Sequence, residues 1–137
     1  MGLSTDAKKE NVYINEIWMK RTITVSLANL MINSDEVAYN EEGKAKVKLS
    51  LQSCVDKAIS NGVISQNNTL NQDQETAIQD MTNNKEAIKN VKSIGYFLDV
   101  ELKEEVVNNE TKYVAVYMLI YAKNNVISKF EGKNILV

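Results

Sequence analysis

The feature that most constrains the fold of this chain is the run from Tyr113 to Ala122, because both of its side-chain faces are apolar. Successive side chains of a β-strand point to opposite sides of a sheet. A strand that is apolar on both sides therefore fits the middle of a sheet that is covered on both faces. The pairs Asn108-Asn109 and Asn124-Asn125 bracket this run, and asparagine tolerates the positive φ of tight turns. We expect a central strand joined to its neighbours by two hairpins.

The segments on either side of the central run also have β-patterns. The preceding strand alternates the apolar residues Leu98, Val100 and Leu102 with polar ones, which predicts one solvated face. Residues 126–130 form a third expected strand, and Gly132 then permits a bend or a bulge. The chain ends on Ile135-Leu136-Val137, so 134–137 is a candidate short fourth strand. An apolar end after a β-pattern indicates a docked terminus, either on this chain's own core or on a neighbouring copy.

Helical spacing dominates the part of the chain before residue 92. The first helix, 11–32, has apolar residues on two faces. One face carries Ile14, Ile17, Trp18, Val25 and Ala28, and the other carries Leu27, Leu30 and Met31. A helix that is apolar on both faces is buried on both faces. We expect it to be the central element of the domain, and the alternative is that one face is an interface.

Three further helices follow, each with a polar start. Asn40 is the expected N-cap of a helix over 42–61, and Gly62 is its expected C-cap. Shorter helices are expected near 71–81 and 85–91, with the pair Asn83-Asn84 between them. The inward residues expected in these helices are Val47, Leu51, Val55, Ala58, Ile59, Ala77, Ile78, Met81, Ala87, Ile88 and Val91.

The order of elements predicts an α+β fold in which N-terminal helices pack on a small antiparallel β-meander. We expect a disordered leader over 1–10 and a single α+β domain over 11–137, mainly helical in 11–92 and a meander in 93–137. A C-terminal arm over 133–137 completes this division. The core is predicted to bring together six residues: Trp18, Leu27, Val55, Leu98, Val116 and Met118.

The residues for catalysis and metal binding are scarce. The chain has no histidine and one cysteine, Cys54, and its net charge is −2 with a single arginine among its cations. The usual general base, a zinc cluster and a basic field for nucleic acid are therefore missing. Asp99 and Glu101 are interpreted as a solvated strand face, and Cys54 as a small buried residue. We expect no enzyme activity, no cofactor, no metal, and neither nucleic acid nor a membrane as partner.

A series of short sequence motifs resembles the C-terminal region of contractile tail sheath proteins of bacteriophages, and of sheath-like phage structural proteins. The motifs cover nearly the whole chain after residue 11. They are Asn15-Glu16-Ile17-Trp18-Met19-Lys20, Ala28-Asn29-Leu30, Tyr39-Asn40-Glu41-Glu42-Gly43, Ala58-Ile59-Ser60-Asn61-Gly62-Val63-Ile64, Ile94-Gly95-Tyr96-Phe97-Leu98-Asp99-Val100, Leu119-Ile120-Tyr121-Ala122-Lys123 and Val126-Ile127-Ser128-Lys129-Phe130-Glu131-Gly132. Sheath proteins are normally longer, so the chain is expected to correspond to their C-terminal part.

The resemblance implies a structural subunit of a phage contractile tail that assembles into rings or a helical tube by adding β-strands between subunits. It implies other copies of the chain and a tail tube protein as partners. It also implies a place in the virion tail after assembly in the cytoplasm of the bacterial host. We expect the inter-subunit contact at Lys133, Asn134, Ile135, Leu136 and Val137, with Gly132 as a hinge. The alternatives are another tail or baseplate component, or an adaptor that binds one partner by strand addition.

Overall fold

The computed structural model describes residues 3–33 and 37–136, in which four helices precede three strands. The helices are α1 (Leu3–Asn33), α2 (Glu41–Ser60), α3 (Gln72–Thr82) and α4 (Lys85–Ser93). The strands are β1 (Tyr96–Val107), β2 (Glu110–Lys123) and β3 (Val126–Leu136). This order confirms the predicted α+β class, with helices first and an antiparallel meander last.

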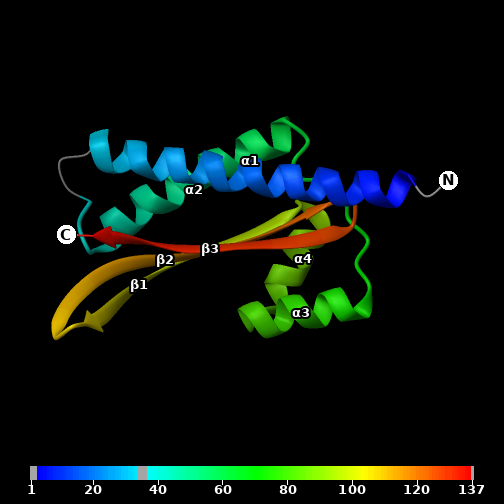
Figure 1. The fold of residues 1–137 in the computed structure, drawn as a ribbon. Coiled ribbons are helices and arrows are strands. Elements are labelled where there is room, and N and C mark those ends of the chain that lie inside the picture. The colour runs from blue at the N-terminus through cyan, green and yellow to red at the C-terminus, as the bar shows by residue number, and fades with distance from the viewer. Residues whose placement is uncertain (1–2, 34–36, 137) are drawn as a thin grey trace.

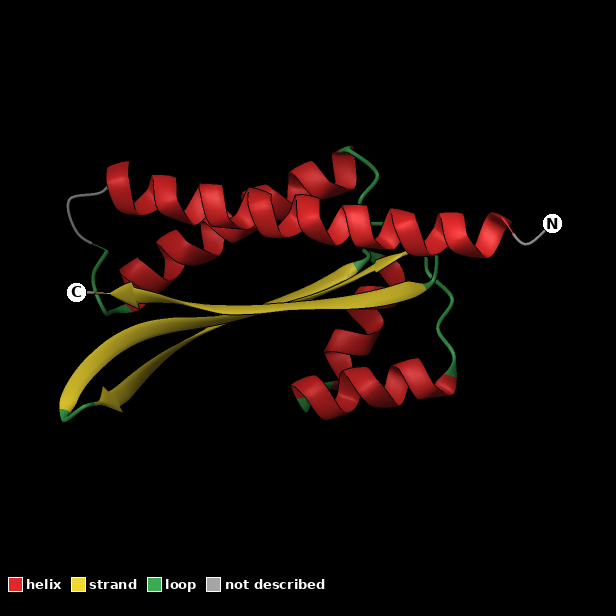
Figure 2. Cartoon of the chain, viewed as in Figure 1, coloured by secondary structure: helices red, strands yellow, loops and turns green. Residues whose placement is uncertain are grey.

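The three strands form one sheet with β2 in the centre, as its two apolar faces predicted. Figure 1 and Figure 2 show α1 and α2 lying over one face of the sheet, and α3 and α4 lying against one end of the other face. Residues 115, 117, 119 and 121 of β2 join the core beneath α1 and α2. Ile120 and Ala122, which alternate with them, pack with Ile78 and Val91 of α3 and α4. The sheet therefore separates two apolar cores.

Asparagine residues shape most of the turns and caps. Asn108, Asn109, Asn124 and Asn125 all have positive φ, as type I′ hairpins require. The Asn40 side chain accepts a hydrogen bond from the Gly43 backbone N–H at the start of α2. These local signals confirm the predicted hairpins and the predicted cap of α2.

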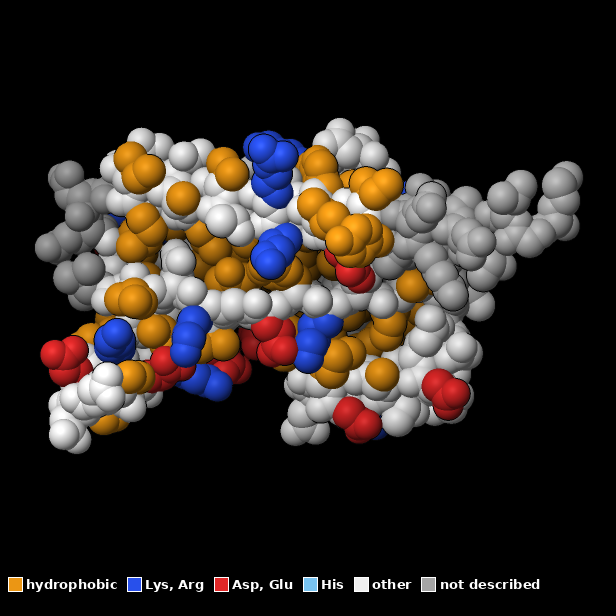
Figure 3. Space-filling model, viewed as in Figure 1, with side chains coloured by type: hydrophobic (Ala, Val, Ile, Leu, Met, Phe, Trp, Pro, Cys, Tyr) orange, Lys and Arg blue, Asp and Glu red, His pale blue; other side chains and the backbone are white. Residues whose placement is uncertain are grey.

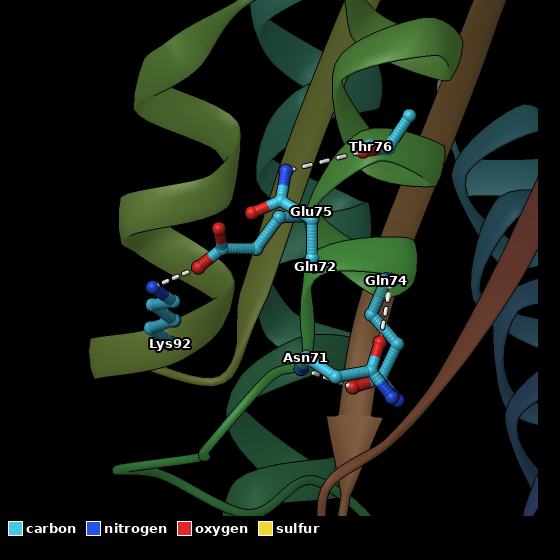
Figure 4. Close-up of polar contacts among 6 residues, drawn as sticks. All are labelled: Asn71, Gln72, Gln74, Glu75, Thr76 and Lys92. Carbon is cyan, nitrogen blue, oxygen red and sulfur yellow. Dashed lines mark hydrogen bonds and ion pairs between the residues drawn. The ribbon is translucent and has the colours of Figure 1, made fainter.

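Figure 4 shows the polar contacts at the start of α3 and the ion pair that joins α3 to α4. Asn71 and Gln74 form a capping box, in which each side chain accepts a hydrogen bond from the other residue's backbone N–H. An ion pair between Lys92 and Glu75 joins α4 to α3. Asn83, in the left-handed region, ends α3, and Asn84 then caps α4. The interruption predicted at Asn83-Asn84 is confirmed.

The packing of α1 differs from the sequence-based expectation. Among the side chains of α1 that the structure describes, Met19, Ile23 and Leu27 are buried, whereas Ile14, Ile17 and Val25 are at least half exposed. Of the two apolar faces, the face that includes Leu27 turns toward α2 and the sheet. The prediction that α1 is the central element is wrong, because α1 lies in an outer layer (Figure 1). Hydrophobic periodicity identifies two faces but does not say which of them meets the sheet.

The predicted six-residue core also needs correction at two positions, Val116 and Met118. Val116 is only half-buried, and Met118 packs with the α3–α4 core, so neither joins the core of Trp18 and Leu27. Both residues are even-numbered in β2, and strand alternation places them on the opposite face from Tyr117.

The ends of the chain also differ from the expected boundaries. Helix α1 begins at Leu3 instead of near Asn11, because no glycine or proline interrupts residues 3–10 and most of them favour a helix. The expected short fourth strand is part of β3, which continues through Gly132 to Leu136. Val137 lies outside the described residues.

Candidate interaction surfaces

The first candidate surface is the outer edge of β3. This strand lies at one edge of the described sheet and pairs with β2 from Val126 to Leu136. Figure 3 shows a white band of backbone and uncharged polar atoms between the side chains of α1 and a row of charged side chains. An edge strand presents backbone N–H and C=O groups to any strand that adds to it. We call this surface the β3 edge.

The hairpin geometry indicates which backbone groups of the β3 edge face outward. A two-residue turn is closed by a pair that exchanges both hydrogen bonds, which here is Lys123 and Val126. The direction in which the backbone N–H and C=O groups point alternates from residue to residue along a strand. The N–H groups of β3 that point away from β2 therefore come from odd-numbered residues. These are Ile127, Lys129, Glu131, Lys133 and Ile135, whose side chains share the face of Met118 and Val116. Two of them, Lys133 and Ile135, belong to the contact expected from sequence.

Residues 133–136 are paired with their own sheet in this structure. Lys133, Asn134, Ile135 and Leu136 lie opposite Val116, Ala115, Val114 and Tyr113, in that order. Leu136 is 3% exposed and belongs to the core beneath α1 and α2. The Lys133 ammonium donates to the Glu105 carboxylate at 2.9 Å, which links β3 to β1 across β2. These contacts attach the segment to the domain and leave its outer backbone groups facing away from β2.

Gly132 has a packing function that the sequence did not indicate. A Cβ atom at this position would lie 2.3 Å from Tyr117 Oη and 2.5 Å from Tyr117 Cζ. Tyr117 is 7% exposed and stacks on Phe130, with ring centroids 6.1 Å apart. The Tyr117 ring therefore occupies the space that a side chain at position 132 would need, and only glycine leaves that space free.

The second candidate surface is the outer face of α1, which we define by Ile14, Ile17, Val25 and Ile32. Their exposed fractions are 59%, 50%, 52% and 79%. On a helical wheel they lie opposite Met19, Ile23 and Leu27, so none of the described elements covers them. Figure 3 shows hydrophobic side chains gathered along α1. The sequence pattern predicts an apolar face here and leaves both burial in the core and an interface open.

A groove adjoins the outer face of α1 on the side of α2. Its volume is about 390 Å³, and among the described residues that line it are Trp18, Arg21, Val25 and Lys57. Two of the described lining residues are cationic, and none of those described is acidic. The outer face of α1 therefore combines an apolar stripe with positive charge.

A polar contact joins α1 to the sheet near the other end of β3. The Ser128 hydroxyl donates to the Glu16 carboxylate at 3.1 Å. Burial raises the pKa of Tyr121 to about 12, a hydrogen bond with Ser128 partly opposes this, and the charge of Glu16 adds to it. Burial also raises the pKa of Tyr117. Tyr117 and Tyr121 both lie in the core beneath α1 and α2, while Tyr113 stays 39% exposed and contacts Tyr39.

The acidic and thiol groups do not form a metal site in the described part of the chain. Within residues 3–33 and 37–136, no group of three or more His, Cys, Asp or Glu side chains is placed to hold a metal ion. Cys54 is 1% exposed and lies against the Thr22 carbonyl, as expected for a small buried residue. None of the helices over the same residues combines the length and the hydrophobicity that a membrane crossing requires.

Comparison with protein families gives one match that spans most of the chain. The family described as "E217 tail sheath protein gp31-like, C-terminal domain" matches residues 11–136. No curated protein matches the chain. The match covers α1 from residue 11, the other three helices and the whole sheet.

Proposed function

The chain belongs to the family of E217 tail sheath protein gp31-like C-terminal domains, a structural family of phage tails, and we propose that it polymerises by strand addition at the β3 edge. Membership makes it a sheath-like component of a virion. The observation that carries the proposal is the outward-facing backbone of β3, an edge strand of 11 residues.

Strand addition suits this edge for physical reasons. An added strand takes its affinity from backbone hydrogen bonds and its register from alternating side chains. The residues of β3 whose backbone groups face outward form a charged run of alternating sign, Lys129, Glu131 and Lys133, flanked by Ile127 and Ile135. A neighbour's extended segment therefore meets a defined charge pattern along the edge.

The contact expected from sequence at Lys133–Val137 is kept in this proposal in a modified form. These residues receive the neighbour's strand on their outer side while residues 133–136 stay paired with β2. Releasing them as a free arm would expose Leu136 and break the Lys133–Glu105 ion pair. Gly132, expected as a hinge, then serves the packing of Tyr117 in the domain.

A neighbour that adds a segment other than its own β3 edge makes a head-to-tail contact, which does not close on itself in a dimer and generates rings or helical filaments. A tail tube protein is the second partner that we propose, enclosed by the polymer in the virion tail. Assembly would take place in the cytoplasm of the bacterial host. A pull-down with the purified tube protein tests this second contact.

The strand-addition contact is tested with Glu131→Pro, which removes an outward N–H from an exposed position of an edge strand that tolerates proline. Glu131→Ala is the matched control, because it removes the same side chain and its ion pair with Lys129 but keeps the N–H. Sedimentation velocity and electron microscopy measure assembly, and circular dichroism checks folding.

We expect the parent chain and Glu131→Ala to form large assemblies and Glu131→Pro to remain monomeric and folded. Normal polymers of Glu131→Pro would refute strand addition at this edge. A parent chain that forms only a closed one-to-one complex with a single partner would instead favour the adaptor alternative.

A further inference from the structure

We propose that the outer face of α1 is a second contact between copies, which binds the tip of the β1–β2 hairpin of a neighbouring chain. This inference rests on the proposed function, since it adds a contact to the same polymer. The hairpin tip is defined here by Val106 and Val107 with the adjacent Glu104 and Glu110.

The hairpin tip is an exposed apolar protrusion. Val106 is 73% exposed and Val107 is 44% exposed. Figure 1 shows the β1–β2 hairpin projecting away from the helices at the end of the sheet opposite α3 and α4. The two valine side chains point to opposite faces of the ribbon. A hairpin tip of this kind is suited to insertion into a groove, where each side chain meets one wall.

The charges of the two surfaces are complementary. Between residues 101 and 112 the hairpin carries four carboxylates and two ammonium groups, and Glu104 and Glu110 are exposed beside the two valines. The groove beside the outer face of α1 is lined by Arg21 and Lys57 and by no acidic residue among those described. Opposite charges around two apolar patches favour their association and fix its orientation.

The contact must join two different copies. The outer face of α1 points away from the sheet, since Met19, Ile23 and Leu27 on the opposite side of the helix are buried against it. The hairpin of the same chain continues the sheet, and Tyr113 near its base contacts Tyr39 in the segment that precedes α2. A hairpin therefore cannot reach the outer face of its own α1. Helix and hairpin tip are different surfaces, so their contact is head-to-tail and agrees with a ring or a helical polymer.

Cross-linking between two labelled chains tests this contact. One chain carries Val25→Cys and the other carries Val106→Cys, and the mixture is treated with a short bis-maleimide. Leu49→Cys replaces Val25→Cys in the control, because Leu49 is 72% exposed on α2. The native Cys54 is 1% exposed, so the unmodified chain reports the background.

We expect a cross-linked dimer only in the mixture of Val25→Cys with Val106→Cys chains. Arg21→Glu in the first chain, or Glu104→Lys with Glu110→Lys in the second, should abolish the product, and combining both changes should restore it. If the outer face of α1 binds the tail tube protein instead, no cross-link will form between copies, and this result would overturn the proposal.

Repeating the cross-link with Glu131→Pro in both chains separates the two contacts. A dimer that persists when the β3 edge is blocked supports the α1 contact independently of strand addition. Loss of the dimer in that background would show that the hairpin contact has no affinity of its own and would contradict the inference. If Glu131→Pro leaves polymers intact, strand addition fails while the cross-link result still decides the α1 contact.

Discussion

Gly132→Ala tests whether Gly132 is a hinge or a packing residue. The new Cβ would lie 2.3 Å from Tyr117 Oη, 2.5 Å from Cζ and 3.0 Å from Cε2. These distances are far below van der Waals contact, so either the Tyr117 ring or the strand must move. Because Tyr117 is buried and stacked on Phe130, the ring has little freedom to turn away.

The magnitude follows from two opposing effects. Overpacking of a filled core costs about 1–3 kcal/mol. Replacing glycine by alanine where the backbone permits it stabilises by about 0.4–1 kcal/mol, since the unfolded chain loses freedom. We therefore expect Gly132→Ala to lower the free energy of unfolding by up to about 2.6 kcal/mol, measured by urea denaturation.

A double-mutant cycle with Tyr117→Leu isolates the contact, because leucine lacks the hydroxyl oxygen and the two ring carbons that meet the new Cβ. In the Tyr117→Leu background, Gly132→Ala should be neutral or stabilising, which gives a coupling energy of about 1–3 kcal/mol. Tyr117→Phe is the graded control, because it removes only Oη and leaves Cζ in place. A coupling energy near zero would refute the packing argument, and a loss of assembly without loss of stability would favour the hinge.

Two further predictions concern the core beneath α1. Leu27→Ala should cost about 2–5 kcal/mol in urea denaturation because Leu27 is 5% exposed, whereas Ile17→Ala, at a half-exposed position, should change stability by less than about 0.5 kcal/mol. Equal losses of stability for the two variants would contradict the orientation of α1 in which Leu27 faces the core and Ile17 faces outward. The raised pKa of Tyr121 means that folding favours its protonated form, so stability should be retained below pH 10 and fall as the pH rises from 10 toward about 12. Tyr121→Phe should show a smaller fall over the same range in thermal unfolding at stepped pH, and an unchanged fall would exclude Tyr121 as its source.

Local signals in the sequence determined most of the secondary structure. The Asn108-Asn109 and Asn124-Asn125 turns, the Asn40 cap and the two-faced strand β2 depend on short-range backbone preferences, which residue type largely decides. The same signals identified the order of elements, and the similarity of the short motifs pointed to the sheath family.

Only the tertiary structure decided what each apolar surface meets. The sequence shows two apolar faces on α1, but burial depends on the position of the sheet, and the face with Leu27 is the one that packs. It also shows a glycine at 132 and cannot show the Tyr117 ring that fills the space beside it from an adjacent strand. Such contacts join residues that are far apart in the chain, so no local pattern encodes them. That is the physical reason why the outer face of α1, for which sequence periodicity left both the core and an interface open, became a candidate interface once the fold was known.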